Sequence, residues 1–81
     1  MKYTVACYFD VELRKFNPPM LVPMNREDTI ESVIDSTKKG QIPGADAFEL
    51  NILGTYDTAT GKFELSEQPE FVERLGDYVR K

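Results

Sequence analysis

The chain contains no histidine and no tryptophan, and Cys7 is its only cysteine. One cysteine cannot form an intramolecular disulfide, and a structural zinc site takes four Cys or His ligands. The EF-hand calcium pattern is also absent from the sequence. We therefore expect no metal site, no cofactor and no nucleophile activated by histidine.

Carboxylates are the remaining candidates for acid–base catalysis. A pair is conceivable among Asp10, Glu12, Asp46 and Asp57. With 14 acidic residues in 81, however, close pairs arise by chance and solvated carboxylates explain them. We expect a protein that is not an enzyme, and no residue is nominated as catalytic.

No run of apolar residues approaches the ~18 required for a membrane-spanning helix. No signal-peptide pattern is visible, and together with the single cysteine this predicts a reducing cytoplasm. The length of 81 residues predicts one domain over residues 1–81. A domain this small buries only ~60–65% of its unfolded surface, which makes a homodimer the expected state.

Acidic residues outnumber basic ones by 14 to 10, which gives a net charge of −4. Residues 1–40 hold six of each sign, whereas residues 41–81 hold four basic and eight acidic residues. Phosphate binding depends on basic surface, so this balance argues against an indiscriminate nucleic-acid coat protein. Any contact with nucleic acid has to use a local patch, mainly from the first half.

Apolar residues alternate with polar ones from Tyr3 to Leu13, which predicts a strand with one buried face. Regular pairing is expected from about Lys2 to Phe9. Cys7 falls on the predicted buried face, where a thiol packs as a small apolar group. Prolines at positions 18, 19 and 23 then predict an extended segment with at most a short edge strand.

The segment from Asn25 to Gly40 carries the signals of one helix. Asn25 or Asp28 is suited to cap its start, and Gly40 follows the last turn as a C′ residue. A single mostly apolar stripe runs along it at Ile30, Val33, Ile34 and Thr37.

Residues 48–65 predict a hairpin with a bulge at Gly54 and a turn that ends at Gly61 with positive φ. Pro69 then predicts the first turn of a second helix. Its apolar stripe would comprise Phe71, Val72, Leu75, Tyr78 and Val79. The expected fold class is α+β: a small antiparallel or mixed sheet, in the order β, extended segment, α, β, β, α, with two helices on one face.

The candidate nucleic-acid-binding residues are Lys2, Tyr8, Arg14, Lys15 and Lys62. If the helices cover the face of Val5, Cys7 and Phe9, the open face shows Thr4, Tyr8, Asn51, Leu53 and Tyr56. An exposed aromatic ring beside lysines is how single-strand binders stack bases. An open aromatic face equally suits dimerisation, so both alternatives remain.

Several segments occur in a specific order, namely Tyr8-Phe9-Asp10, Pro18-Pro19-Met20, residues 48–57, Thr60-Gly61-Lys62-Phe63 and Pro69-Glu70-Phe71-Val72. In this order they resemble the small nonstructural protein of gokushoviruses, the single-stranded-DNA microviruses (Microviridae) of bacteria. The most specific part is Leu53-Gly54-Thr55-Tyr56-Asp57 with Thr60-Gly61-Lys62-Phe63. Because these residues form a bulge and a turn, they point to a shared fold more than to a mechanism.

The resemblance implies a DNA-binding protein of the infected host cytoplasm, outside the mature virion. It would act in viral DNA replication, at the stage when synthesis changes from duplex DNA to the single-stranded genomes that are packaged. The family has no catalytic motif to transfer. The alternative is a protein-interaction adaptor for replication or assembly proteins. It would dock through the open sheet face or through the acidic second helix with Glu70, Glu73 and Asp77.

Overall fold

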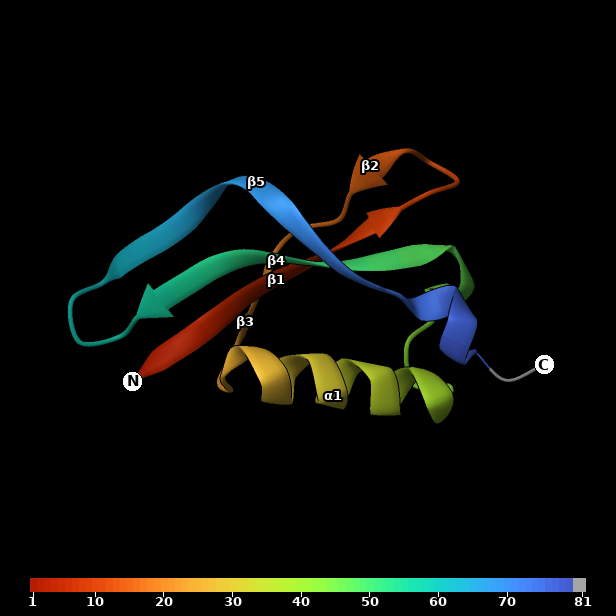
Figure 1. Cartoon of the computed structure of the whole chain (residues 1–81), viewed down its shortest axis with the longest axis horizontal. Helices are drawn as coiled ribbons and strands as arrows, with labels where there is room; N and C mark the ends of the chain where they lie inside the picture. Colours follow the sequence, from red (N-terminus) through yellow and green to blue (C-terminus); the bar gives the residue numbers. More distant parts are fainter. Residues whose placement is uncertain (80–81) are drawn as a thin grey trace.

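A computed structural model describes residues 1–79 of the chain (Figure 1). Its elements in chain order are β1 (Lys2–Asp10), β2 (Lys15–Phe16), β3 (Met20–Val22), α1 (Arg26–Lys38), η1 (Ala45–Ala47), β4 (Phe48–Asp57), β5 (Lys62–Arg74) and η2 (Leu75–Tyr78), where η marks a short 3-10 helix. The strands form a five-stranded antiparallel sheet curved into a half-barrel. The predicted α+β class is confirmed, whereas the described chain has one α-helix instead of two.

β1 lies inside the sheet and organises it. It pairs with β2 and β3 along one edge and with β4 along the other, and β4 then pairs with β5. In Figure 1, β1 and β4 cross in projection and β5 arches over them, as expected for a strongly twisted sheet. The short strand β3 confirms the edge strand expected between the prolines.

Both ends of α1 follow the sequence signals. The side chain of Asn25 accepts a hydrogen bond from the backbone N–H of Asp28 at 2.8 Å, which identifies Asn25 as the N-cap. At the other end, Gly40 has a φ of 71° and its N–H donates to the carbonyl of Thr37. Val33 and Thr37 of the predicted stripe are buried, together with Thr29.

The predicted second helix from Pro69 is wrong. β5 continues as a strand through Arg74, and only the single turn of η2 follows it. The ladder between β4 and β5 breaks after Leu65 and resumes at Glu70. Pro69 lies in this interruption, where its missing N–H costs no ladder hydrogen bond. The first half of β4 offers a strand partner to residues 70–74, and this pairing overrides the local helical pattern.

The predicted hairpin is confirmed, with Lys62 opposite Asp57 and Phe63 opposite Tyr56. Gly61 has a φ of 72°, as the turn requires. Gly54 has a φ of 151° and lies where both of the ladders of β4 shift register, which confirms the bulge.

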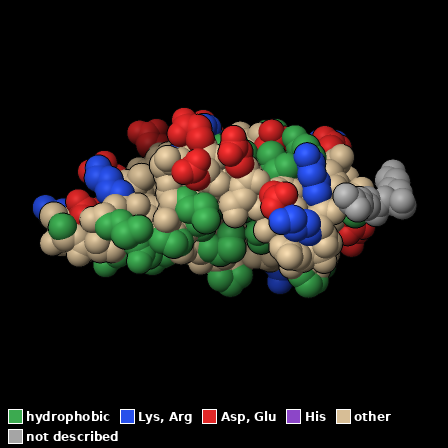
Figure 2. Space-filling view, turned by 90° about the horizontal axis from the view of Figure 1, so that it is seen from below, with side chains coloured by type: hydrophobic (Ala, Val, Ile, Leu, Met, Phe, Trp, Pro, Cys, Tyr) green, Lys and Arg blue, Asp and Glu red, His purple; other side chains and the backbone are tan. Residues whose placement is uncertain are grey.

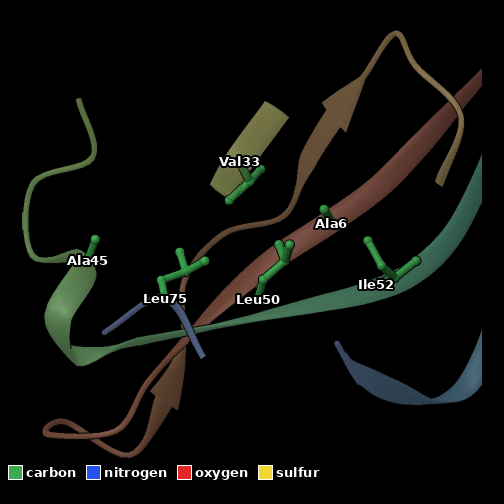
Figure 3. Close-up of a cluster of buried hydrophobic side chains, with 6 residues drawn as sticks. All are labelled: Ala6, Val33, Ala45, Leu50, Ile52 and Leu75. Atoms are coloured by element: carbon green, nitrogen blue, oxygen red, sulfur yellow. The ribbon is translucent and has the colours of Figure 1, made fainter. Parts of the chain in front are cut away.

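The core lies between the sheet and α1 (Figure 3). Its buried members come from β1, α1, η1, β4 and η2, and comprise Ala6, Val33, Ala45, Leu50, Ile52 and Leu75. Since side chains alternate along β1, the helix covers the face of Ala6 and Tyr8, not the face of Cys7. The expected assignment of the two faces was therefore wrong, and Thr4 and Tyr8 lie on the helix side.

Candidate nucleic-acid interface

The side of the sheet opposite α1 is termed the outer face. The registers of the strand pairs place on it Tyr3, Val5, Cys7, Phe9, Phe16, Leu21, Asn51, Tyr56, Phe63, Leu65 and Phe71. No helix among the described residues covers this face. Asn51 and Tyr56 were expected on an open face and do lie there.

The centre of the outer face is already buried by the sheet itself. Val5 and Cys7 are only 3% and 2% exposed. In the register, Val5 is flanked by Leu21 on β3 and by Gly54 on β4, beyond which lies Leu65. Burial raises the pKa of the Cys7 thiol, because a thiolate is poorly solvated there. Its predicted role as an inert packed thiol fits this position.

Large apolar side chains around that centre remain accessible to solvent. The exposed fractions are 49% for Phe16, 46% for Leu21, 53% for Phe63, 59% for Leu65 and 54% for Phe71. These residues line β2, β3 and β5, the strands at the borders of the sheet. An accessible apolar surface of this kind indicates a binding site.

Three charged side chains of the described strands have the parity of the outer face, namely Glu49, Glu67 and Arg74. Glu49 and Arg74 are register partners at its margin and form an ion pair at 3.8 Å. The carboxylates of Glu64 and Glu70 lie on the helix side, opposite Thr55 and Ile52.

The exposed carboxylates of α1 add to this acidic side: Glu27, Asp28, Glu31 and Asp35. Seen from the helix side, acidic side chains gather along one long edge of the molecule and hydrophobic ones along the other (Figure 2). The carboxylates of α1 and those of Glu64 and Glu70 therefore lie away from the outer face.

One end of the outer face combines aromatic rings with lysines, and we term it the hairpin-end cluster. The rings of Tyr56 and Phe63 are 4.6 Å apart between centroids. In the next row of the sheet, Asp57 lies between Lys2 and Lys62. Both lysines are exposed. This row belongs to the helix-side parity, and Lys2 lines a pocket on that side together with Thr4, Asn25 and Glu70.

The other end repeats this combination, and we term it the turn-end cluster. The rings of Phe9 and Phe16 meet edge to face at 4.8 Å. Lys15 is the register partner of Asp10, and Arg14 lies in the preceding turn with a φ of 53°. Asp10 is engaged in that turn, because its carboxylate accepts hydrogen bonds from the backbone N–H groups of Glu12 and Leu13.

The four predicted phosphate-binding cations are not engaged by carboxylates within the described range. The ion pairs of residues 1–79 join Arg26 to Glu70, Lys39 to Asp35 and Arg74 to Glu49. None of them includes the exposed basic residues of the two clusters, Lys2, Arg14, Lys15 and Lys62. These side chains can therefore receive an anion without first breaking a salt bridge.

Tyr8 is separated from the other candidates. Its ring stacks on Phe48 with centroids 5.2 Å apart and packs against the core on the helix side. Partial burial raises the pKa of its phenol. The position expected for it as an exposed stacking ring is taken instead by Phe16, Phe63 and Phe71. Alternation in the sequence did not single out Phe63, and the predicted second helix concealed the position of Phe71.

Comparisons with protein-family models, curated proteins and solved structures found no match to this chain. In the part of the chain that the structure describes, no three side chains converge as a metal site. Within the same residues, no helix has both the length and the apolar character to cross a membrane.

Proposed function

We propose that this protein binds single-stranded DNA along the outer face of its sheet. Exposed rings at the two ends of the face stack on bases, while neighbouring lysine and arginine side chains neutralise phosphates. The observation that carries the proposal is the pairing of an exposed phenylalanine with unpaired cations at each end. Phe63 follows Lys62 and Phe16 follows Lys15 along the chain, with the lysines in the helix-side rows of Asp57 and Asp10.

The net charge of −4 does not prevent phosphate from approaching the outer face, because positive and negative side chains are separated on the molecule. The carboxylates of α1 and of the helix side of β5 do not face a strand laid on the outer face. The local potential at the two clusters, rather than the total charge, then governs the approach of phosphate.

The spacing of the clusters suits a short run of nucleotides. Tyr3 and Phe9 mark the two ends along β1, and six residues of strand at ~3.3 Å each separate them by about 20 Å. That length corresponds to several nucleotides, in the range of ~4–16 that sheet-based single-strand sites occupy.

The resemblance to the gokushovirus nonstructural protein supplies a setting for this activity. In that setting the protein acts in the cytoplasm of an infected bacterium and holds new single-stranded genomes as replication gives way to packaging. The proposal assigns no enzymatic step, since the clusters contain no catalytic constellation among the described residues.

Fluorescence anisotropy of a labelled single-stranded oligonucleotide, titrated at several salt concentrations, tests the proposal. Binding should weaken with salt, with a logarithmic slope of ~0.7 per phosphate engaged. The double variants K2E/K62E and R14E/K15E should each weaken binding at least tenfold. The double reversal K38E/K39E is the matched control, because Lys38 and Lys39 are exposed cations at the end of α1, away from both clusters. Absence of binding by the wild type at low salt refutes the proposal.

A protein-interaction adaptor is the second candidate, and the aliphatic middle of the outer face favours it. Leu21 and Leu65 cannot stack on bases, yet both are about half exposed. The acidic helix once expected to dock a partner is not formed. Glu70 is paired with Arg26, and Glu73 accepts a hydrogen bond from Tyr78. A partner recovered from infected cells by the wild type, but not by a Leu65→Glu variant, would favour this candidate.

A further inference from the structure

We infer that the middle of the outer face, around Leu21, Leu65 and Phe71, is the seat of a second copy of this chain. These side chains surround a centre that is already buried at Val5 and Cys7. Covering them extends this small apolar centre into a second core. The inference concerns the protein without DNA and does not rest on the proposed function.

The distribution of charge selects a copy of this chain over a charged partner. Among the described residues, the outer face carries the ion pair of Glu49 with Arg74 at its margin and, by alternation along β5, the carboxylate of Glu67 between Leu65 and Phe71. The middle of the face, around Leu21, Leu65 and Phe71, offers a strongly charged partner little complementary charge, because the lysine and arginine side chains stand at its two ends. A copy related by a two-fold axis presents the same apolar side chains, and such self-complementarity is what an isologous interface requires.

The outer face is large enough for a dimer interface. The molecule measures 43 × 24 × 16 Å, so a face along its long axis covers on the order of 700–1,000 Å². Standard interfaces bury ~800 Å² per partner, which such a face is large enough to supply.

The shape of the sheet points the same way. A half-barrel leaves its side opposite the helix without a second layer, and closed barrels and sandwiches bury that side. A second half-barrel placed over the outer face supplies the missing layer. A DNA strand along the outer face and a second copy over it would occupy the same surface, so the dimer is the state of the protein without DNA, and single-stranded DNA should displace the second copy.

Sedimentation equilibrium of the full chain without DNA, across a wide range of micromolar concentrations, tests the inference. The expected mass is twice that of the 9.3 kDa chain. Leu65→Glu should raise the dimer dissociation constant at least roughly tenfold, because it places an unpaired charge at the centre of the interface. Leu65 is 59% exposed in the single chain, so the variant should keep the wild-type circular dichroism spectrum.

Met24→Glu is the matched control, because Met24 is an exposed apolar residue just before α1 and outside the outer face. It should dimerise like the wild type. A wild-type protein that stays monomeric at all concentrations overturns the inference, as does a Leu65→Glu variant that dimerises normally. A wild type that dimerises but does not bind DNA supports this interface and refutes the proposed function, so the two failures are distinguishable.

Discussion

Gly54 on β4 and Glu64 on β5 approach so closely that a side chain at position 54 would overlap the Glu64 carbonyl group. Gly54 also has a φ of 151°, which residues with a side chain rarely adopt. Gly54→Ala therefore combines backbone strain with a clash against a strand that cannot move alone. We expect it to lower the free energy of unfolding by about 3 kcal/mol or more, measured by urea denaturation.

Gly40→Ala separates the two contributions, because Gly40 has a φ of 71° but no atom near the position of an added Cβ. Only strain applies there, at about 1 kcal/mol. Equal losses in the two variants would show that the contact with Glu64 does not matter.

The N-cap of α1 can be assigned by experiment. Asn25→Ala should cost about 1 kcal/mol, because the N–H of Asp28 loses its side-chain acceptor. Asn25→Asp preserves an acceptor and should cost little. Asp28→Ala removes only a charge near the helix start, so its melting temperature should lie between those of Asn25→Ala and Asn25→Asp. A larger loss for Asp28→Ala than for Asn25→Ala would contradict the cap.

Stability should fall in alkaline solution. Burial raises the pKa of Cys7 above 9.0 and that of Tyr8 above 10.0, the ordinary values of these groups. Below those values both groups are protonated in the folded and the unfolded state, and their contribution to the free energy of unfolding is complete. As the pH rises, the groups ionise first in the unfolded chain, so the free energy of unfolding falls between the ordinary and the raised pKa of each group and stays low above it. Urea unfolding on both sides of this window should show the decline, and a Cys7→Ala/Tyr8→Phe variant should show less of it.

Truncation of Tyr8 should lower stability but leave DNA binding unchanged, whereas truncation of Phe63 should weaken DNA binding at little cost in stability. Tyr8→Ala removes a ring stacked on Phe48 and should cost about 2 kcal/mol of stability. Phe63→Ala removes a 53% exposed ring and should cost much less. If bases stack on Phe63, its loss should weaken single-stranded DNA binding about tenfold, in line with ~1–3 kcal/mol per stacked base. A folded Tyr8→Ala protein should bind DNA normally, and an inverted pattern would return the stacking role to Tyr8.

Local signals in the sequence determined the parts of this fold whose conformation depends on near neighbours. The alternation of β1, the caps of α1 and the turn at Gly61 all follow from short-range sterics and hydrogen bonding, and each was predictable. The bulge at Gly54 was also predictable, because only glycine accepts that backbone conformation. The basic candidates Lys2, Arg14, Lys15 and Lys62 were found from their positions at strand ends and turns.

Tertiary structure decided which face of the sheet the helix covers and whether residues 70–74 form a helix or a strand. Apolar residues occur on both faces of β1, so alternation alone could not assign Tyr8 to the core and Phe63 to solvent. The pattern around Phe71 and Leu75 suits a helix locally, but the unpaired backbone of β4 offered hydrogen bonds that only the folded sheet supplies. That pairing places Phe71 on the outer face.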